Sequence, residues 1–137
     1  AQYYLQLHDT GKRSIKLDRK GGSLFSGGDN DLAACACDIG MGVGLFHQLI
    51  VDHYIPKDRL TKAYLLKLAR GISASSVVLK AYRGEAIPKK KFARRMLDFF
   101  VYLSKDSIAR QFMLAERKGV KEGLMIIDRV DAKLQQK

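Results

Sequence analysis

Apolar side chains recur at spacings of three and four residues along most of this 137-residue chain, and this spacing constrains the fold more than any other feature. Such a spacing places the apolar residues on one side of an α-helix, which can then be buried. The longest series consists of Leu32, Ala36, Ile39, Val43, Phe46 and Ile50. Successive series, separated by proline or glycine, predict about six helices, at residues 31–54, 57–70, 73–84, 88–103, 104–119 and 120–135.

The first thirty residues follow a different pattern. Residues 3–8 alternate apolar and polar side chains, with Leu5 and Leu7 on one side, and the alternation resumes at Ile15 and Leu17 after turn-forming residues 9–12. This predicts a short β-hairpin in residues 1–20. Residues 21–30 are rich in glycine and predict a flexible loop; an anion cradle is the alternative, but no P-loop pattern accompanies it. With a helical bundle in residues 31–137, the chain is expected to form a single, mostly α-helical domain over residues 1–137.

The series in residues 31–54 contains small residues at a spacing of four, namely Ala36, Gly40 and Gly44. Glycine costs about 1 kcal/mol relative to alanine inside a helix, so a ridge of small residues suggests close approach of another helix. We expect this ridge to serve helix packing or self-association, with a wedged ligand as the alternative. The same stretch contains Asp38, which favours a buried helix over a membrane span.

The positive charge of the chain is concentrated in its middle. The formal net charge is +11, of which residues 1–55 contribute −1, residues 56–95 contribute +10 and residues 96–137 contribute +2. A positive field this local attracts polyanions, and nucleic acid is the commonest of them. An acidic protein partner and a merely solubilising charge are the alternatives.

A run of cations, Lys89, Lys90 and Lys91, follows Pro88 at the start of a predicted helix. Cations are unfavourable at a helix N-terminus, so a bound anion is the more economical explanation of their position than solubility alone. We therefore expect phosphate contacts in the basic segment, residues 56–95. The cations expected to make them are Lys62, Lys67, Arg70, Lys80, Arg83, Lys89, Lys90, Lys91, Arg94 and Arg95.

Little in the sequence points to catalysis. His47 and His53 are six residues apart and do not share a helix face, and the chain has no metal-binding or nucleophile motif. Cys35 and Cys37 are too few and too close for a disulfide framework. We expect no enzymatic activity, no catalytic residue, no metal and no cofactor, and a cytoplasmic location without membrane association.

Part of the basic segment resembles a known DNA-binding motif. Residues 60–100 resemble the helix-turn-helix of the lambda-repressor/Cro family, with the turn at residues 71–77 and a later boundary at residues 83–88. The resemblance implies that Ala74, Ser75, Ser76 and Lys80 face the major groove. The sequence departs from that family at Lys67, where the family has a small residue, and by about one extra residue between Gly71 and Gly84.

In gross features alone, the whole chain resembles the small helical subunits of multi-subunit CRISPR effector complexes. That resemblance implies contacts with a nucleic-acid backbone, DNA or RNA, and packing against further subunits. We therefore predict a non-enzymatic nucleic-acid-binding protein, acting as a subunit of a larger nucleoprotein complex. A helix-turn-helix transcriptional regulator and an adaptor for an acidic protein are the alternatives.

Overall fold

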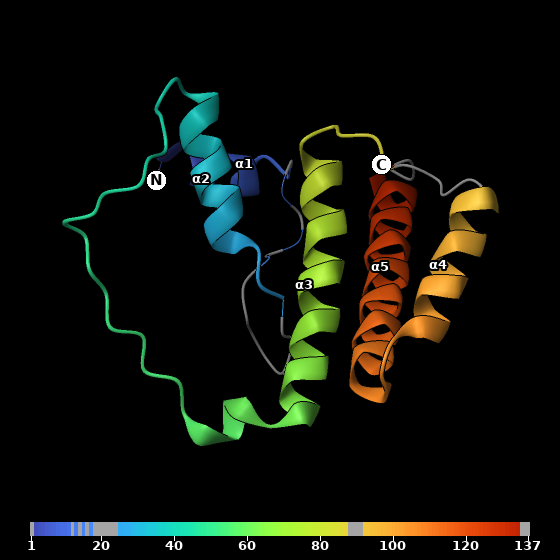
Figure 1. Ribbon diagram of the computed structural model, residues 1–137. Helices are drawn as coiled ribbons and strands as arrows, with labels where there is room; N and C mark the ends of the chain where they lie inside the picture. Colours follow the sequence, from blue (N-terminus) through green and yellow to red (C-terminus); the bar gives the residue numbers. More distant parts are fainter. Residues whose placement is uncertain are drawn as a thin grey trace.

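The computed structural model describes residues 2–11, 13, 15, 17, 25–87 and 92–134. These residues are mostly helical and include no β-strand (Figure 1). In chain order the elements are α1 (Gln2–Asp9), α2 (Gly28–Asp38), the 3-10 turn η1 (Lys57–Leu60), α3 (Lys62–Tyr82), α4 (Phe92–Ser104) and α5 (Ser107–Leu134).

The centre of the fold is the pair formed by α3 and α5. The two helices run in the same direction, because Gly119 meets Arg70 and Ser73 while Gly123 meets Ala74 and Val77 further along. A Cβ atom built on Gly123 would lie 2.7 Å from the Cβ atom of Val77. The two glycines therefore let the helix backbones approach more closely than side chains would allow. α4 runs back along the outer side of α5 and connects the parallel pair (Figure 1).

The opposite side of α3 packs against the N-terminal part of the chain. The buried apolar residues there and at the α5 contact are Leu7, Leu17, Cys35, Ala74, Val77 and Val78. Thr61 caps the start of α3 by accepting a hydrogen bond from the Tyr64 amide at 3.3 Å. Gly84 ends the helix in the left-handed conformation, at φ 68°.

The predicted N-terminal β-hairpin is wrong, because residues 2–9 form the helix α1. Tyr4 and His8 are four residues apart, and their rings meet edge-to-face with centroids 4.8 Å apart. Leu7 is buried, whereas Leu5, expected on the same side, is exposed. Contacts at a spacing of four thus prevail over the alternating pattern.

The predicted helix at residues 31–54 is also wrong, because α2 ends at Asp38. Gly40 adopts a left-handed conformation at φ 82°, which ends the helix, and residues 41–56 continue as extended chain and turns. Ala36, Gly40 and Gly44 therefore form no helical ridge. A side chain on Gly44 would meet only the ring of Phe46, at 3.6 Å.

The predicted count of six helices is corrected to five in the described residues. α3 passes through Gly71 and α5 passes through Gly119, at positions where a break between helices was predicted. Glycine was interpreted as a stop signal there, but in α5 it marks a helix–helix contact. No helix in the described residues combines the length and apolarity needed to cross a membrane.

Candidate nucleic-acid interface

Three lysines of the basic segment lie exposed on α3. None of Lys62, Lys67 and Lys80 forms an ion pair with another described residue. Lys62 and Lys80 are eighteen residues apart, which is about five helical turns, so both lie on the same side of α3 with roughly 27 Å between them. α3 thus presents fixed, unneutralised cations to solvent.

Two other predicted cations of the segment are occupied by carboxylates. Arg70 makes a two-pronged contact with Glu122 of α5, in which its Nε donates to Oε2 at 2.7 Å. Arg83 donates to Asp38 at 3.1 Å and lies 3.7 Å from Glu85. The hydrogen bond and negative charge of Asp38 raise the pKa of Arg83. Arg70 therefore links α3 to α5, and Arg83 links it to the end of α2.

The turn implied by the helix-turn-helix resemblance is absent, since residues 71–77 lie within the continuous helix α3. Ala74 and Ser75 are each only 1% exposed and do not reach the surface. The Ser75 hydroxyl accepts from the Ser26 amide at 2.9 Å and donates to the Gly71 carbonyl at 2.8 Å. Ser76 is exposed beside Lys80 on the solvent side of α3.

The remaining predicted cations are only partly covered by the structure. Lys89, Lys90 and Lys91 lie outside the described residues. Arg94 and Arg95 lie in the first turn of α4, which begins at Phe92. The structure describes the backbone of these two residues but not their side chains. The structure therefore places three of the predicted cations exposed on α3, with Lys67 about 140° around the helix from Lys62 and Lys80. The predicted anion site before α4 stays an expectation.

Other exposed cations stand outside the set of predicted contact residues. Lys57 and Arg59 lie on η1, just before the α3 lysines, and Lys118 and Lys121 lie exposed on α5. The signal for the η1 pair was present, since both residues belong to the basic segment 56–95. The α5 pair lies outside that segment, where acidic residues nearly balance the charge.

A buried polar cluster connects the N-terminal residues to α3. The Arg13 guanidinium lies 3.3 Å from Asp31, which is 1% exposed, and 4.7 Å above the ring of Tyr82. Arg13 also donates to the Tyr82 carbonyl at 3.0 Å. The Tyr82 hydroxyl accepts from the Ile15 amide at 2.6 Å and donates to the Ile15 carbonyl at 3.1 Å. This cluster orients the N-terminal part against α3.

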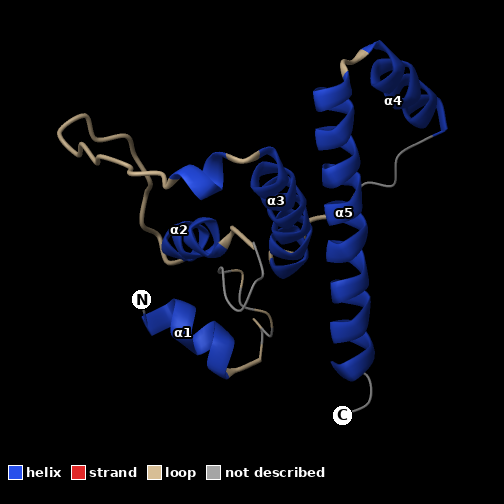
Figure 2. Cartoon of the chain, turned by 90° about the horizontal axis from the view of Figure 1, so that it is seen from below, coloured by secondary structure: helices blue, strands red, loops and turns tan. Residues whose placement is uncertain are grey.

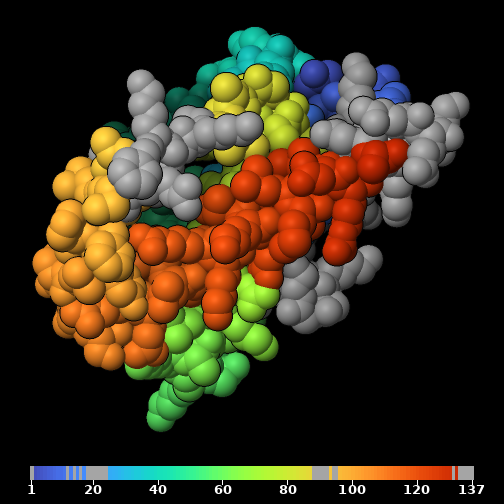
Figure 3. Space-filling view, turned by 90° about the vertical axis from the view of Figure 1, so that its right-hand side faces the viewer, coloured from blue at the N-terminus to red at the C-terminus, as the bar shows by residue number. Residues whose placement is uncertain are grey.

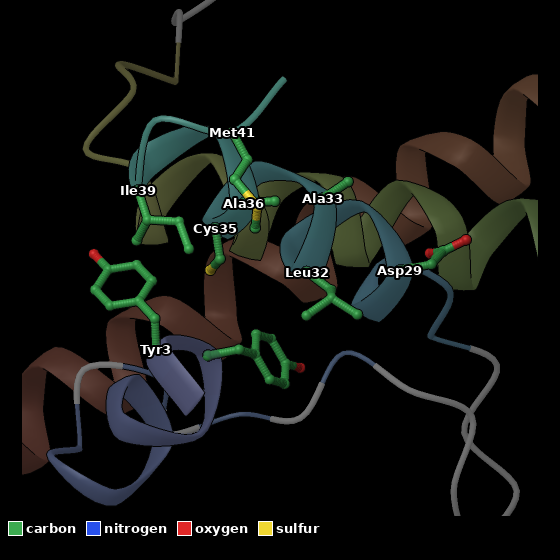
Figure 4. A pocket seen from close by; sticks show the side chains of 9 residues that line it. Tyr3, Asp29, Leu32, Ala33, Cys35, Ala36, Ile39 and Met41 are labelled. Atoms are coloured by element: carbon green, nitrogen blue, oxygen red, sulfur yellow. The ribbon is translucent and has the colours of Figure 1, made fainter. Parts of the chain in front are cut away.

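An apolar pocket of about 410 Å³ lies between α1 and α2. Tyr3 lies opposite Ile39 across it (Figure 4), and Leu32 and Met41 also line it. Asp29 is the acidic residue of the lining. Within the described part of the chain, no three metal-ligating side chains gather in one place. Most of the lining is apolar, so the pocket is suited to apolar contact.

The two cysteines provide a test of the N-terminal packing. Cys35 is buried and Cys37 is exposed, and burial together with the negative charge of Asp31 raises the pKa of the Cys35 thiol. Because the thiolate is the reactive form, we expect iodoacetamide at neutral pH to modify Cys37 at least roughly tenfold faster than Cys35. Peptide mass spectrometry over time measures both rates. Equal rates would show that Cys35 is not buried in solution, against its position in α2 here.

Comparison of the chain with protein-family models, curated proteins and solved structures finds no match. The resemblances noted from the sequence therefore stay predictions.

Proposed function

We propose that this protein binds nucleic acid non-enzymatically, through phosphate contacts made by the basic segment 56–95. The observation that carries the proposal is the set of exposed lysines on α3, Lys62, Lys67 and Lys80, which have no carboxylate partner among the described residues. By contrast, Arg70 on the same helix and Arg83, which directly follows it, are matched by acidic side chains. The α3 lysines are thus available to an external anion.

The electrostatics favour an extended polyanion over a small anion. Lys62 and Lys80 lie roughly 27 Å apart on a rigid helix, and a small anion cannot contact both. A nucleic-acid backbone supplies charges along such a distance, and each neutralised phosphate releases bound counterions. Contacts to phosphate carry no base information, so binding through them is expected to be indifferent to sequence.

We place this activity in a larger nucleoprotein assembly in the cytoplasm, in line with the gross resemblance to small helical subunits of CRISPR effector complexes. The helix-turn-helix alternative gains no support from α3, which is continuous through residues 71–77. An adaptor for an acidic protein stays as the alternative that uses the same cations.

Fluorescence anisotropy with labelled duplex DNA, single-stranded DNA and single-stranded RNA tests the proposal. If the three α3 lysines each contact a duplex phosphate, affinity for the duplex should fall at least roughly 40-fold between about 50 and about 200 mM salt. A protein that binds none of the three probes at the lower salt would instead fit the acidic-partner alternative.

A further inference from the structure

An exposed apolar segment connects α2 to α3. This strap, residues 39–56, leaves the helices and runs outside the rest of the chain (Figure 1). Its exposed side chains include Phe46 at 67%, Ile50 at 83% and Tyr54 at 87%. The backbone hydrogen bond from Leu49 to the Phe46 carbonyl closes one turn within it. Apolar side chains gathered at this density mark an interaction surface.

A second apolar surface lies on α4, which turns its apolar side outward. Phe99, Phe100 and Leu103 are exposed, whereas Asp98 and Tyr102 are partly covered. On the covered side, Arg110 and Arg117 lie 5.6 Å and 5.8 Å from the Tyr102 ring centre. α4 is therefore held to α5 by polar and cation–π contacts, at the edge of the molecule (Figure 3).

The exposed area of the whole chain is large enough for an extensive interface. The chain exposes 10,792 Å², about 3,600 Å² more than the roughly 7,200 Å² expected of a compact 15.4 kDa monomer. Obligate homodimers bury about 1,000–2,500 Å² on each chain. The excess surface thus exceeds what a permanent complex of two copies requires.

The charge distribution indicates which part of the chain can approach a second copy. The strap contains no lysine or arginine and one aspartate, Asp52, in a chain of net charge +11. Residues 88–105 around α4, in contrast, carry six cations and one acidic residue. A strap laid on α4 therefore avoids the like-charge repulsion that two basic segments would suffer.

We infer that the strap of one copy covers the apolar face of α4 on a second copy. Within one chain the two surfaces lie on opposite sides of the α3–α5 pair (Figure 2), so neither covers the other. Between copies the contact is reciprocal: each chain supplies a strap and receives one. A closed pair with two such contacts is the commonest form of homo-oligomer. This inference is independent of nucleic-acid binding.

Two charge substitutions test the contact in the full-length chain. Ile50→Asp places a charge on the strap, and Phe100→Asp places one on the apolar face of α4. Each substitution is expected to weaken self-association roughly 100-fold, as measured by analytical ultracentrifugation. The matched controls Gln48→Asp and Ser104→Asp add the same charge at exposed polar positions and should keep the mass of the parent. Circular dichroism should stay unchanged, because Ile50 and Phe100 are exposed.

Mixing the Ile50→Asp and Phe100→Asp variants distinguishes a strap–α4 contact from a strap–strap contact. The mixture should form a one-to-one pair, because an intact strap on one chain meets an intact α4 on the other. A parent that is monomeric, a Phe100→Asp variant that self-associates as well as the parent, or a mixture that stays monomeric would each overturn the inference.

Cross-linking gives a readout that does not depend on weakened association. The background chain carries Cys35→Ser and Cys37→Ser and has no cysteine. Two variants of it, one with Ile50→Cys and one with Phe100→Cys, are mixed and treated with a bifunctional maleimide. We expect cross-linked pairs in the mixture and few in either variant alone. Efficient cross-linking of Ile50→Cys with itself would overturn the inference in favour of strap–strap pairing.

Discussion

A Gly119→Ala variant is expected to lose about 2–3 kcal/mol of the free energy of unfolding. The added Cβ would overlap the Arg70 carbonyl oxygen and lie 2.8 Å from the Cβ atom of Ser73. The carbonyl belongs to the backbone of α3 and cannot move aside as a side chain would, so the two helices must separate. Alanine gains about 1 kcal/mol in helix propensity, which offsets only part of the cost of overpacking.

Thermal denaturation followed by circular dichroism measures this loss, with an expected fall in Tm of roughly 10 °C. Gly44→Ala is the matched control, since its Cβ would meet only the ring of Phe46 at 3.6 Å, and its Tm should stay within about 2 °C of the parent. A Gly119→Ala variant as stable as the parent would contradict the close contact of α3 and α5.

The contrast between these glycines shows what the sequence could and could not predict. Regular apolar spacing predicted helices at residues 57–70, 73–84, 104–119 and 120–135, and the structure joins most of these residues into the two continuous helices α3 and α5. Whether Gly71 and Gly119 end a helix or permit a close contact depends on which residues lie across the interface. The local sequence does not show which residues those are. A spacing of four between Gly119 and Gly123 was the available signal for a contact face.

The N-terminal errors have a similar cause. The alternation around Leu5 suited a strand, but residues 2–9 form a helix, in which the Tyr4 and His8 rings meet and Leu5 is exposed while Leu7 is buried. In residues 39–56 the apolar spacing continued past the end of α2, and the helix was extended with it. The left-handed Gly40 ends α2 instead, and the apolar side chains remain exposed. Apolar spacing alone does not distinguish burial within a chain from burial against another one.

The location of the basic segment could be predicted from the sequence, but the pairing of its cations could not. Arg70 and Glu122 are 52 residues apart in the sequence, and only the parallel arrangement of α3 and α5 brings them together. Arg83 is matched in the same way by Asp38, from the end of α2. Removing these two from the predicted interface leaves the α3 lysines as its best-defined part.

A Lys62→Gln, Lys67→Gln, Lys80→Gln triple variant is expected to bind nucleic acid roughly 100-fold more weakly than the parent at about 0.1 M salt. Glutamine keeps a long polar side chain and removes the charge that attracts phosphate. The fold should be unaffected, because the three side chains are exposed and form no ion pair with described residues. The matched control is a triple variant that removes the same charge from exposed positions on α5, namely Lys118→Gln, Lys121→Gln and Arg129→Gln.

The most direct test of phosphate binding by α3 is the slope of log affinity against log salt for the parent and both triple variants. Each lost duplex-phosphate contact makes the slope shallower by about 0.9. We therefore expect the α3 variant to differ from the parent by about 2.7 units and the α5 control to keep the slope of the parent. Equal slopes for the parent and the α3 variant, or the same loss in both variants, would contradict the account.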